Sequence, residues 1–187
     1  MELVTAVEEN NIQKVKEILR QDIDVNYEDS SWRNFTSLHH ACSNGNTEIV
    51  KLLMQHERVD VNKQDNDGRT PFLYACLEGR TEIVKHMMQD ERVDVNKPTN
   101  SGETSIWIAC NNNYTQVVQA ILQSGRNINL DTKHDNKTPL ELARQKGHQE
   151  IVNLIENYMK NPAETRKSEP VSQSKKKTKK QKKQNKN

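Results

Sequence analysis

His39, His40 and Cys42 are the residues whose types and spacing come closest to a metal site, with His56 as a further candidate ligand. Imidazole and thiolate groups both bind zinc, but a structural zinc site takes four ligands in converging local pairs. This sequence has only one local group of such residues, and a second group that would complete the four ligands is missing. We therefore expect these side chains to have structural roles, and we predict no bound metal and no other cofactor.

The segment Asp65-Asn66-Asp67-Gly68 is similar to part of a calcium-binding loop. Such a loop requires an acidic residue two positions before the first aspartate and a glutamate at its last position. This sequence has Lys63 and Tyr74 at those two places. Because Asn, Asp and Gly in this order are typical of tight turns, we expect a turn here.

Three cysteines, Cys42, Cys76 and Cys110, are spaced by 34 residues. Packed helices stand ~8–10 Å apart, which is beyond the Cα separation of about 7 Å that a disulfide tolerates. We expect buried free thiols that act as small apolar side chains. No base is paired with them in the pattern, and no glycine-rich phosphate-binding motif is present. The sequence therefore predicts a protein that is not an enzyme.

Lysine is concentrated near the C-terminus. Residues 161–187 hold ten basic and two acidic side chains, a net charge of +8, whereas residues 1–160 hold 18 basic and 24 acidic ones, a net charge of −6. Seven lysines fall within nine positions: Lys175, Lys176, Lys177, Lys179, Lys180, Lys182 and Lys183. Such a run repels itself and buries nothing, which predicts a disordered tail.

Four interpretations of this tail stay open. It could be a nuclear localisation signal recognised by an import receptor, or a weak nucleic-acid contact through phosphate neutralisation. It could also lie against anionic lipid, or serve only to keep the protein in solution. No aromatic side chain is interleaved with the lysines, so base stacking is not predicted.

A 34-residue repeat organises the rest of the chain. Thr36, Thr70, Thr104 and Thr138 share one register, with an alanine five positions after each of them. A threonine before proline is typical of a helix N-terminus, and a glycine four positions after each alanine ends that helix in three of the four copies. A second helix carries apolar residues at helical spacing. Each unit is predicted to be helix, turn, helix and an extended loop with a hairpin-like turn, and the units must stack to bury their apolar faces.

These elements resemble the ankyrin-repeat family. The residues that carry the resemblance are Thr-Pro-Phe-Leu-Tyr-Ala-Cys from Thr70, Thr-Pro-Leu-Glu-Leu-Ala from Thr138, Gly-Arg-Thr-Glu-Ile-Val from Gly79 and the Asp-Val-Asn triplets that end at Asn62 and Asn96. The resemblance implies an all-α solenoid of about five helix-turn-helix units. In animal members of the family such asparagines can be hydroxylated by a dioxygenase, but we expect Asn62 and Asn96 to act as loop-stabilising amides.

The sequence departs from the family pattern at several positions. Serine replaces the proline in two units, and the family's capping histidine, present as His39, is replaced by Leu73, Trp107 and Glu141. Asn113 stands where the other units have glycine, so we expect the unit that contains it to be the least stable inner repeat.

The predicted ankyrin-repeat domain spans residues 1–160 and is followed by the tail, 161–187. Within the domain we expect an N-terminal cap at about 2–33, inner repeats at about 34–67, 68–101 and 102–135, and a C-terminal cap at about 136–159. Terminal repeats need polar outer faces, and both ends of the pattern are more polar than its middle.

The resemblance implies a protein partner bound in the concave groove that the turn tips and first helices form. Carried over by register, the contact residues are Trp32, Arg33, Phe35, Ser43, Asn44, Asn66, Asp67, Arg69, Leu77, Glu78, Asn100, Ser101, Glu103, Asn111 and Asn112. Trp32 and Phe35 are aromatic residues at a turn tip, a type that interface hot spots favour. The alternative for both is packing against the cap helix, and Trp107 is expected to pack within its own repeat.

The sequence shows no signal peptide and no apolar run near the ~18 residues of a membrane span. We expect a monomer in the cytoplasm, the nucleus or both. The first hypothesis is a scaffold or adaptor that binds another protein through the groove. The alternative is a nuclear or RNA-associated factor whose basic tail supplies polyanion binding or nuclear import. A third is a subunit whose catalytic partner is another chain.

Overall fold

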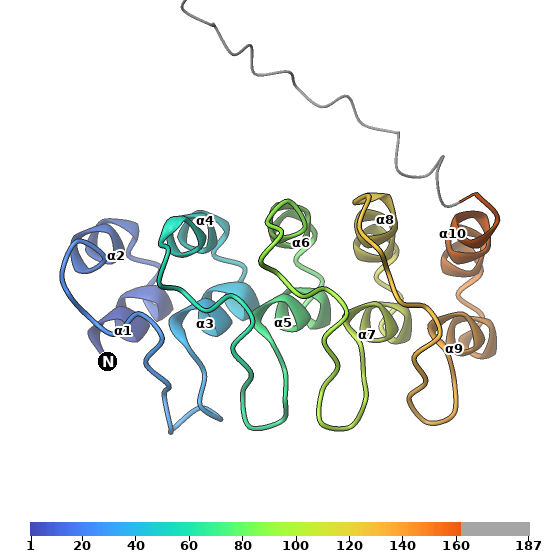
Figure 1. The fold of residues 1–187 in the computed structure, drawn as a ribbon, viewed down its shortest axis with the longest axis horizontal. Coiled ribbons are helices and arrows are strands. Elements are labelled where there is room, and N and C mark those ends of the chain that lie inside the picture. The colour runs from blue at the N-terminus through green and yellow to red at the C-terminus, as the bar shows by residue number, and fades with distance from the viewer. Residues whose placement is uncertain (162–187) are drawn as a thin grey trace, which may run out of the picture.

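The computed structural model describes residues 1–161, which fold into five pairs of antiparallel helices (Figure 1). The first helices of the pairs are α1 (Glu2–Glu8), α3 (Ser37–Asn44), α5 (Pro71–Leu77), α7 (Ser105–Asn111) and α9 (Pro139–Lys146). The second helices are α2 (Ile12–Ile18), α4 (Thr47–Gln55), α6 (Thr81–Met87), α8 (Thr115–Gln123) and α10 (Gln149–Lys160). Apart from Asn161, the predicted lysine-rich tail lies outside the described residues.

The helices form two layers. Each first helix packs against the first helix of the next pair, and each second helix does the same in its own layer. The loops that connect the pairs carry turns that project beyond the layer of first helices, on the side away from the second helices (Figure 1). The all-α repeat solenoid predicted from the sequence is therefore confirmed over the described residues.

The helix ends follow from the residues that the repeat places there. The hydroxyl of Thr70 accepts a hydrogen bond from the backbone N–H of Leu73 at 3.2 Å, and Pro71 opens the helix. Gly147 takes a φ of +73° after α9, and Asn113 takes +59° at the equivalent place after α7. Asparagine thus replaces glycine in the left-handed conformation, as the sequence predicted.

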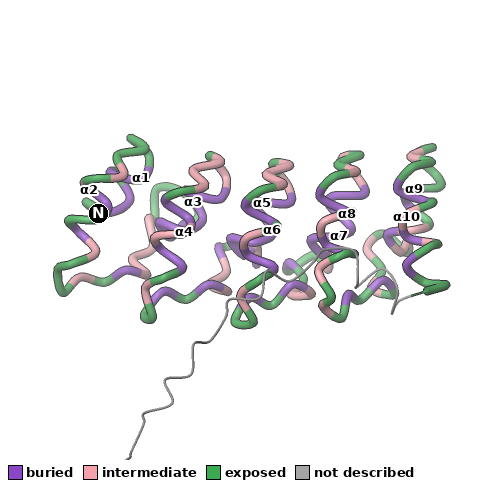
Figure 2. Tube along the Cα trace, turned by 90° about the horizontal axis from the view of Figure 1, so that it is seen from above, coloured by how far each residue is buried: buried purple, intermediate pink, exposed green. Residues whose placement is uncertain are grey.

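The core runs the length of the solenoid, between the two layers and between neighbouring pairs (Figure 2). Small side chains at the centre, such as Ala41, Ala75 and Cys76, are fully buried and allow the helices to approach closely. A second, smaller apolar cluster lies among the first helices alone. It is made by Leu73, Trp107, Ile108 and Leu142, with Leu77 packed against its edge.

The turns are hairpin-like, as predicted, but they differ in length. Asp65 donates its backbone N–H to the carbonyl of Arg69 at 3.0 Å, which closes a short turn. In the first turn the pairing joins Asp29 to Phe35, so two more residues lie between the paired positions. The extra length was not predicted, because the units were aligned on their threonines. The first turn has no sequence motif that marks two added residues.

Asparagine side chains connect the loops of neighbouring units. The Asn62 amide donates to the carbonyl of Arg92 at 2.6 Å and accepts from the backbone N–H of Asp94 at 2.7 Å. Asn26 and Asn96 bridge their own neighbouring loops in the same way. The loop-stabilising roles expected for Asn62 and Asn96 are confirmed.

None of the described helices is long and apolar enough to cross a membrane. Within residues 1–161, no three histidine, cysteine or acidic side chains are grouped so that they could hold a metal ion.

Candidate partner-binding face

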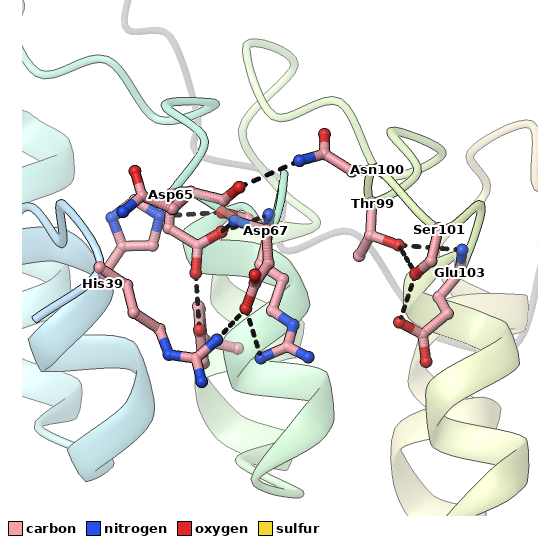
Figure 3. A network of polar contacts seen from close by, with 11 residues as sticks. His39, Asp65, Asp67, Thr99, Asn100, Ser101 and Glu103 are labelled. Atoms are coloured by element: carbon pink, nitrogen blue, oxygen red, sulfur yellow. Dashed lines mark hydrogen bonds and ion pairs between the residues drawn. The ribbon is translucent and has the colours of Figure 1, made fainter.

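Hydrogen bonds join the tips of successive turns (Figure 3). The backbone N–H of Asn66 donates to the carbonyl of Arg33, and that of Asn100 donates to the carbonyl of Asp67, both at 3.0 Å. The Asn100 side-chain amide also donates to the carbonyl of Asn66 at 3.0 Å. These bonds order the first three tips as one continuous row before any partner binds.

Gly68 allows two of these tips to meet. Its φ is +79°, and a Cβ there would lie 2.7 Å from the backbone nitrogen of Asn100. Gly102, one turn later, has a φ of +90° but would meet nothing closer than the Lys133 carbonyl at 3.8 Å. The first glycine therefore serves the contact between tips, whereas the second serves only its own turn.

The carboxylate of Asp65 organises its turn from inside. One oxygen accepts the backbone N–H groups of Asp67 at 2.9 Å and Arg69 at 2.7 Å, and the other accepts the Tyr74 hydroxyl at 2.8 Å. Burial raises the pKa of Tyr74 to about 12, and the bond to Asp65 contributes in the same direction. The segment that is similar to a calcium loop is a turn, as predicted.

The equivalent position in the next turn is Thr99. Its hydroxyl accepts the backbone N–H of Glu103 at 3.0 Å and lies 2.9 Å from the Ser101 hydroxyl. Ser101 in turn donates to the Glu103 carboxylate at 3.0 Å (Figure 3). Two different side chains thus stabilise successive turns, and both direct their polar atoms inward.

His39 joins its own helix start to the next turn. Its Nδ1 accepts the backbone N–H of Thr36 at 3.1 Å, so the ring proton is on Nε2, which donates to the carbonyl of Arg69 at 3.1 Å. Burial lowers the pKa of His39 to about 4, which keeps the ring neutral. The capping role implied by the family resemblance is confirmed.

Aromatic rings gather where the first turn meets α3. Trp32 is 58% exposed, and its ring lies edge-on to that of His40 at 6.3 Å between centroids. Phe35 is buried and packs against His39, His40 and Tyr74 at 4.7 to 5.3 Å. Of the two aromatic residues predicted at this tip, only Trp32 is available to a partner. Phe35 is part of the packing because the longer turn folds it back onto α3.

Trp107 packs within its own repeat, as predicted, and it also contacts the next unit. Its indole N–H donates to the carbonyl of Lys137 at 3.1 Å, and its ring meets His134 edge-on at 4.6 Å. The His39 bond to Arg69 joins the same two repeat positions two units earlier. The indole therefore replaces the family histidine in its contact with the following turn.

Residues 3–99 and 81–165 match the family model described as ankyrin repeats in three copies. The chain belongs to the ankyrin-repeat family. A segment of 71 residues is 32% identical to a 2-5A-dependent ribonuclease from Mus musculus. That segment covers 38% of this ankyrin-repeat protein and only 9% of the ribonuclease.

Most of the predicted contact residues of this ankyrin-repeat protein reach the surface. Exposed are Trp32, Arg33, Asn44, Asn66, Glu78, Asn100 and Ser101, and partly exposed are Ser43, Asp67, Arg69, Leu77, Glu103, Asn111 and Asn112. We call the surface made by the turn tips and the exposed residues of the first helices the turn-side face.

Several polar members of this face are already used within the protein. Arg33 is ion-paired with Asp67, and the Asn112 side chain donates to the carbonyl of Leu77 at 3.3 Å. The sequence indicated that these residues are near the surface. It did not indicate that they hold neighbouring units together, because the partner atoms lie 34 or 35 residues away along the chain.

One residue of this face, Glu8, was missed by the sequence reasoning. Glu8, at the end of α1, has a carboxylate oxygen 3.6 Å from Nδ1 of His40. Burial lowers the pKa of His40, whereas the nearby carboxylates of Glu8 and Asp29 raise it. The available signal was the repeat register itself, because Glu8 aligns with Ser43 and Leu77, which were selected.

The three cysteines of the ankyrin repeats are buried free thiols. Burial raises the pKa of Cys42 and Cys76 far above the usual range and that of Cys110 to about 12. A thiol in such surroundings stays protonated and makes a poor nucleophile.

Proposed function

We propose that this ankyrin-repeat protein is a non-catalytic adaptor that binds a protein partner through its turn-side face. Ankyrin repeats are generally protein–protein interaction modules. The observation that carries the proposal is the exposed indole of Trp32 at the end of a row of turn tips already joined by hydrogen bonds. A large aromatic side chain on a pre-ordered surface combines a hot-spot residue with a low entropic cost of binding.

The composition of the face suits a protein partner. Leu77 offers partly exposed apolar surface on this face, and Asn44, Glu78 and Ser101 add exposed polar groups. Protein–protein interfaces combine apolar and polar groups in this way. The backbone of the tips is held by neighbouring tips, so we propose that binding changes the face little.

Affinity capture with two single variants tests this function. Glu78→Lys changes an exposed side chain of the turn-side face, and Gln119→Lys changes an exposed side chain of α8 in the other layer. We expect Glu78→Lys to lose a specific set of bound proteins and Gln119→Lys to retain it. Equal recovery by both variants would show that the partner uses another surface.

A catalytic role is not proposed. The ribonuclease relative matches only a short segment of its own length, so its activity is not transferred to this chain. The buried, protonated thiols support a non-catalytic protein. A catalytic partner chain remains compatible with the adaptor function, and it would appear among the captured proteins.

We also propose that the seven lysines at 175–183 direct the protein to the nucleus or bind polyanions. This proposal rests on the charge run in the sequence, which lies outside the described residues. A fluorescent fusion carrying glutamine at all seven positions tests it. Loss of nuclear enrichment together with unchanged partner capture would assign separate tasks to the tail and the repeats. Unchanged distribution and unchanged binding to heparin would leave the tail as a solubilising segment.

A further inference from the structure

The negative charge of the described chain is concentrated at its N-terminal end. Residues 1–32 hold eight acidic and three basic side chains, a net charge of −5. Residues 33–161 hold 16 acidic and 15 basic ones, a net charge of −1. Trp32, the exposed aromatic residue of the turn-side face, therefore lies at the strongly acidic end of the solenoid.

Four residues from three elements meet at this end, and we call them the Trp32 cluster. Glu8 ends α1, His40 belongs to α3, and Asp29 and Trp32 belong to the first turn. Trp32 lies edge-on to His40, whose Nδ1 is 3.6 Å from a Glu8 oxygen. The carboxylates of Glu8 and Asp29 both act electrostatically on the His40 ring.

The cluster has more hydrogen-bond acceptors than donors. A carboxylate only accepts, so the neutral His40 ring is favoured with its proton on Nδ1, toward Glu8. Its Nε2 is then an acceptor. This atom is buried and has no hydrogen-bond partner among the described residues, and His40 as a whole is 6% exposed. A buried acceptor without a donor is costly, and such sites are often completed by a bound group.

Nearby cations are largely paired with other residues. Arg33 is bonded to Asp67, and the Lys63 amine lies 2.6 Å from a Glu28 oxygen. The N-terminal ammonium group acts on Asp29, but it is the weakest of the influences on that carboxylate. The Glu8 carboxylate is 43% exposed, and within residues 1–161 its one ion-pair neighbour is the neutral His40. The group that complements this end of the face is therefore a cation with several donors.

We propose that the Trp32 cluster binds an arginine side chain of the protein partner, an assignment that rests on the proposed adaptor function. The guanidinium plane stacks on the exposed indole and donates to the Glu8 carboxylate. Planar stacking and forked donation are both properties of arginine, whereas lysine is a compact charge with three donors and no planar group. A further N–H group of the same guanidinium is the donor that His40 Nε2 lacks.

The test uses the full-length chain and the peptide Ac-Gly-Arg-Gly-amide, with Ac-Gly-Gln-Gly-amide as the uncharged control. Binding is followed by NMR at the two indole N–H signals. We expect the arginine peptide to shift the Trp32 signal. The Trp107 signal should stay fixed because that indole is buried and bonded to Lys137.

Matched charge variants distinguish a local contact in the cluster from the general effect of the protein's negative charge. We expect Glu8→Gln to weaken arginine-peptide binding about threefold, the range of exposed ion pairs. Glu17→Gln removes the same charge from exposed α2 and should leave binding unchanged. Equal binding of the glutamine peptide, or equal affinity in the Glu8 and Glu17 variants, would overturn the proposal.

The chain's own lysines are the rival occupant. If added salt shifts the Trp32 signal in the peptide-free chain and the arginine peptide does not, the cluster holds these lysines, and the assignment to a partner is wrong. The adaptor function is judged separately, by the capture experiment with Glu78→Lys. That function can hold while the arginine assignment fails.

Discussion

At the scale of single residues, one repeat position has been filled in four ways. His39, Leu73, Trp107 and Glu141 occupy the place of the family histidine, and two of them bond to the turn that follows. Leu73 instead joins the small apolar cluster, and Glu141 accepts the backbone N–H of Thr138 at 2.8 Å. The family resemblance implied the role of the histidine. The sequence could not predict the role of the indole, because the acceptor belongs to a packed neighbour 30 residues away.

Trp107→Phe tests the value of that indole bond. The substitution keeps an aromatic ring in the cluster but leaves the Lys137 carbonyl without its donor. We expect the free energy of unfolding in urea to fall by about 1 kcal/mol or somewhat more. Trp32→Phe, at an exposed ring, is the control and should change it little. Equal stability of the two variants would mean that the bond contributes nothing.

The buried neutral His39 makes stability depend on pH. Its folded-state pKa of about 4 lies below the 6.5 of the unfolded chain, so the unfolded state binds one more proton between these values. Stability is therefore complete above pH 6.5 and falls as the pH drops toward 4, by up to about 3 kcal/mol from this residue. His39→Gln should show a flatter dependence in urea unfolding at pH 7 and pH 5. The slope that remains comes from His40 and His86, whose pKa values are also lowered.

At the scale of elements, the turns explain why the face is ordered. Gly68→Ala combines a positive φ, which costs about 1–2 kcal/mol, with a Cβ too close to the Asn100 backbone. Gly102→Ala has only the cost of the positive φ. We expect the Gly68 variant to lose more stability and to expose the Asn100 N–H to hydrogen exchange. Identical losses would show that the tips are not held together by this contact.

The asparagine bridges give a second test at this scale. Asn62→Ala removes one donor and one acceptor that join neighbouring loops, and we expect it to cost about 1–2 kcal/mol in urea unfolding. Asn66→Ala changes an exposed side-chain amide four positions later. Asn66 contacts the neighbouring turns through its backbone N–H and carbonyl groups. This variant should be neutral. A neutral Asn62 variant would contradict the bridging role.

The sequence predicted the elements better than their contacts. Threonine, proline and glycine mark the helix ends by local physics, so the helices and short turns could be read directly. The longer first turn could not, and with it the burial of Phe35 and the exposure of Trp32 were undetermined. Both residues are simply aromatic in the sequence, and which of them faces solvent depends on how the turn folds onto α3.

At the scale of the whole molecule, stability is expected to vary from unit to unit. A solenoid unit contacts only its neighbours, so a weak unit opens locally. We predict that α7 and α8 exchange their amide hydrogens faster than α5 and α6, because Asn113 holds a φ of +59° without being glycine. Asn113→Gly should slow this exchange and raise stability by about 0.5 kcal/mol. Uniform exchange across the inner units would contradict the prediction.

The cross-unit bonds have a consequence for how such a chain can change over evolutionary time. The bonds from Asn62, Arg80 and His148 each reach a carbonyl 30 to 38 residues away, which is one unit distant. A duplicated copy of residues 68–101 would therefore find the same hydrogen-bond donors and acceptors in the units on both of its sides. The protein can lengthen by whole units while the acidic end that carries Trp32 stays unaltered, so reach and recognition are free to evolve separately.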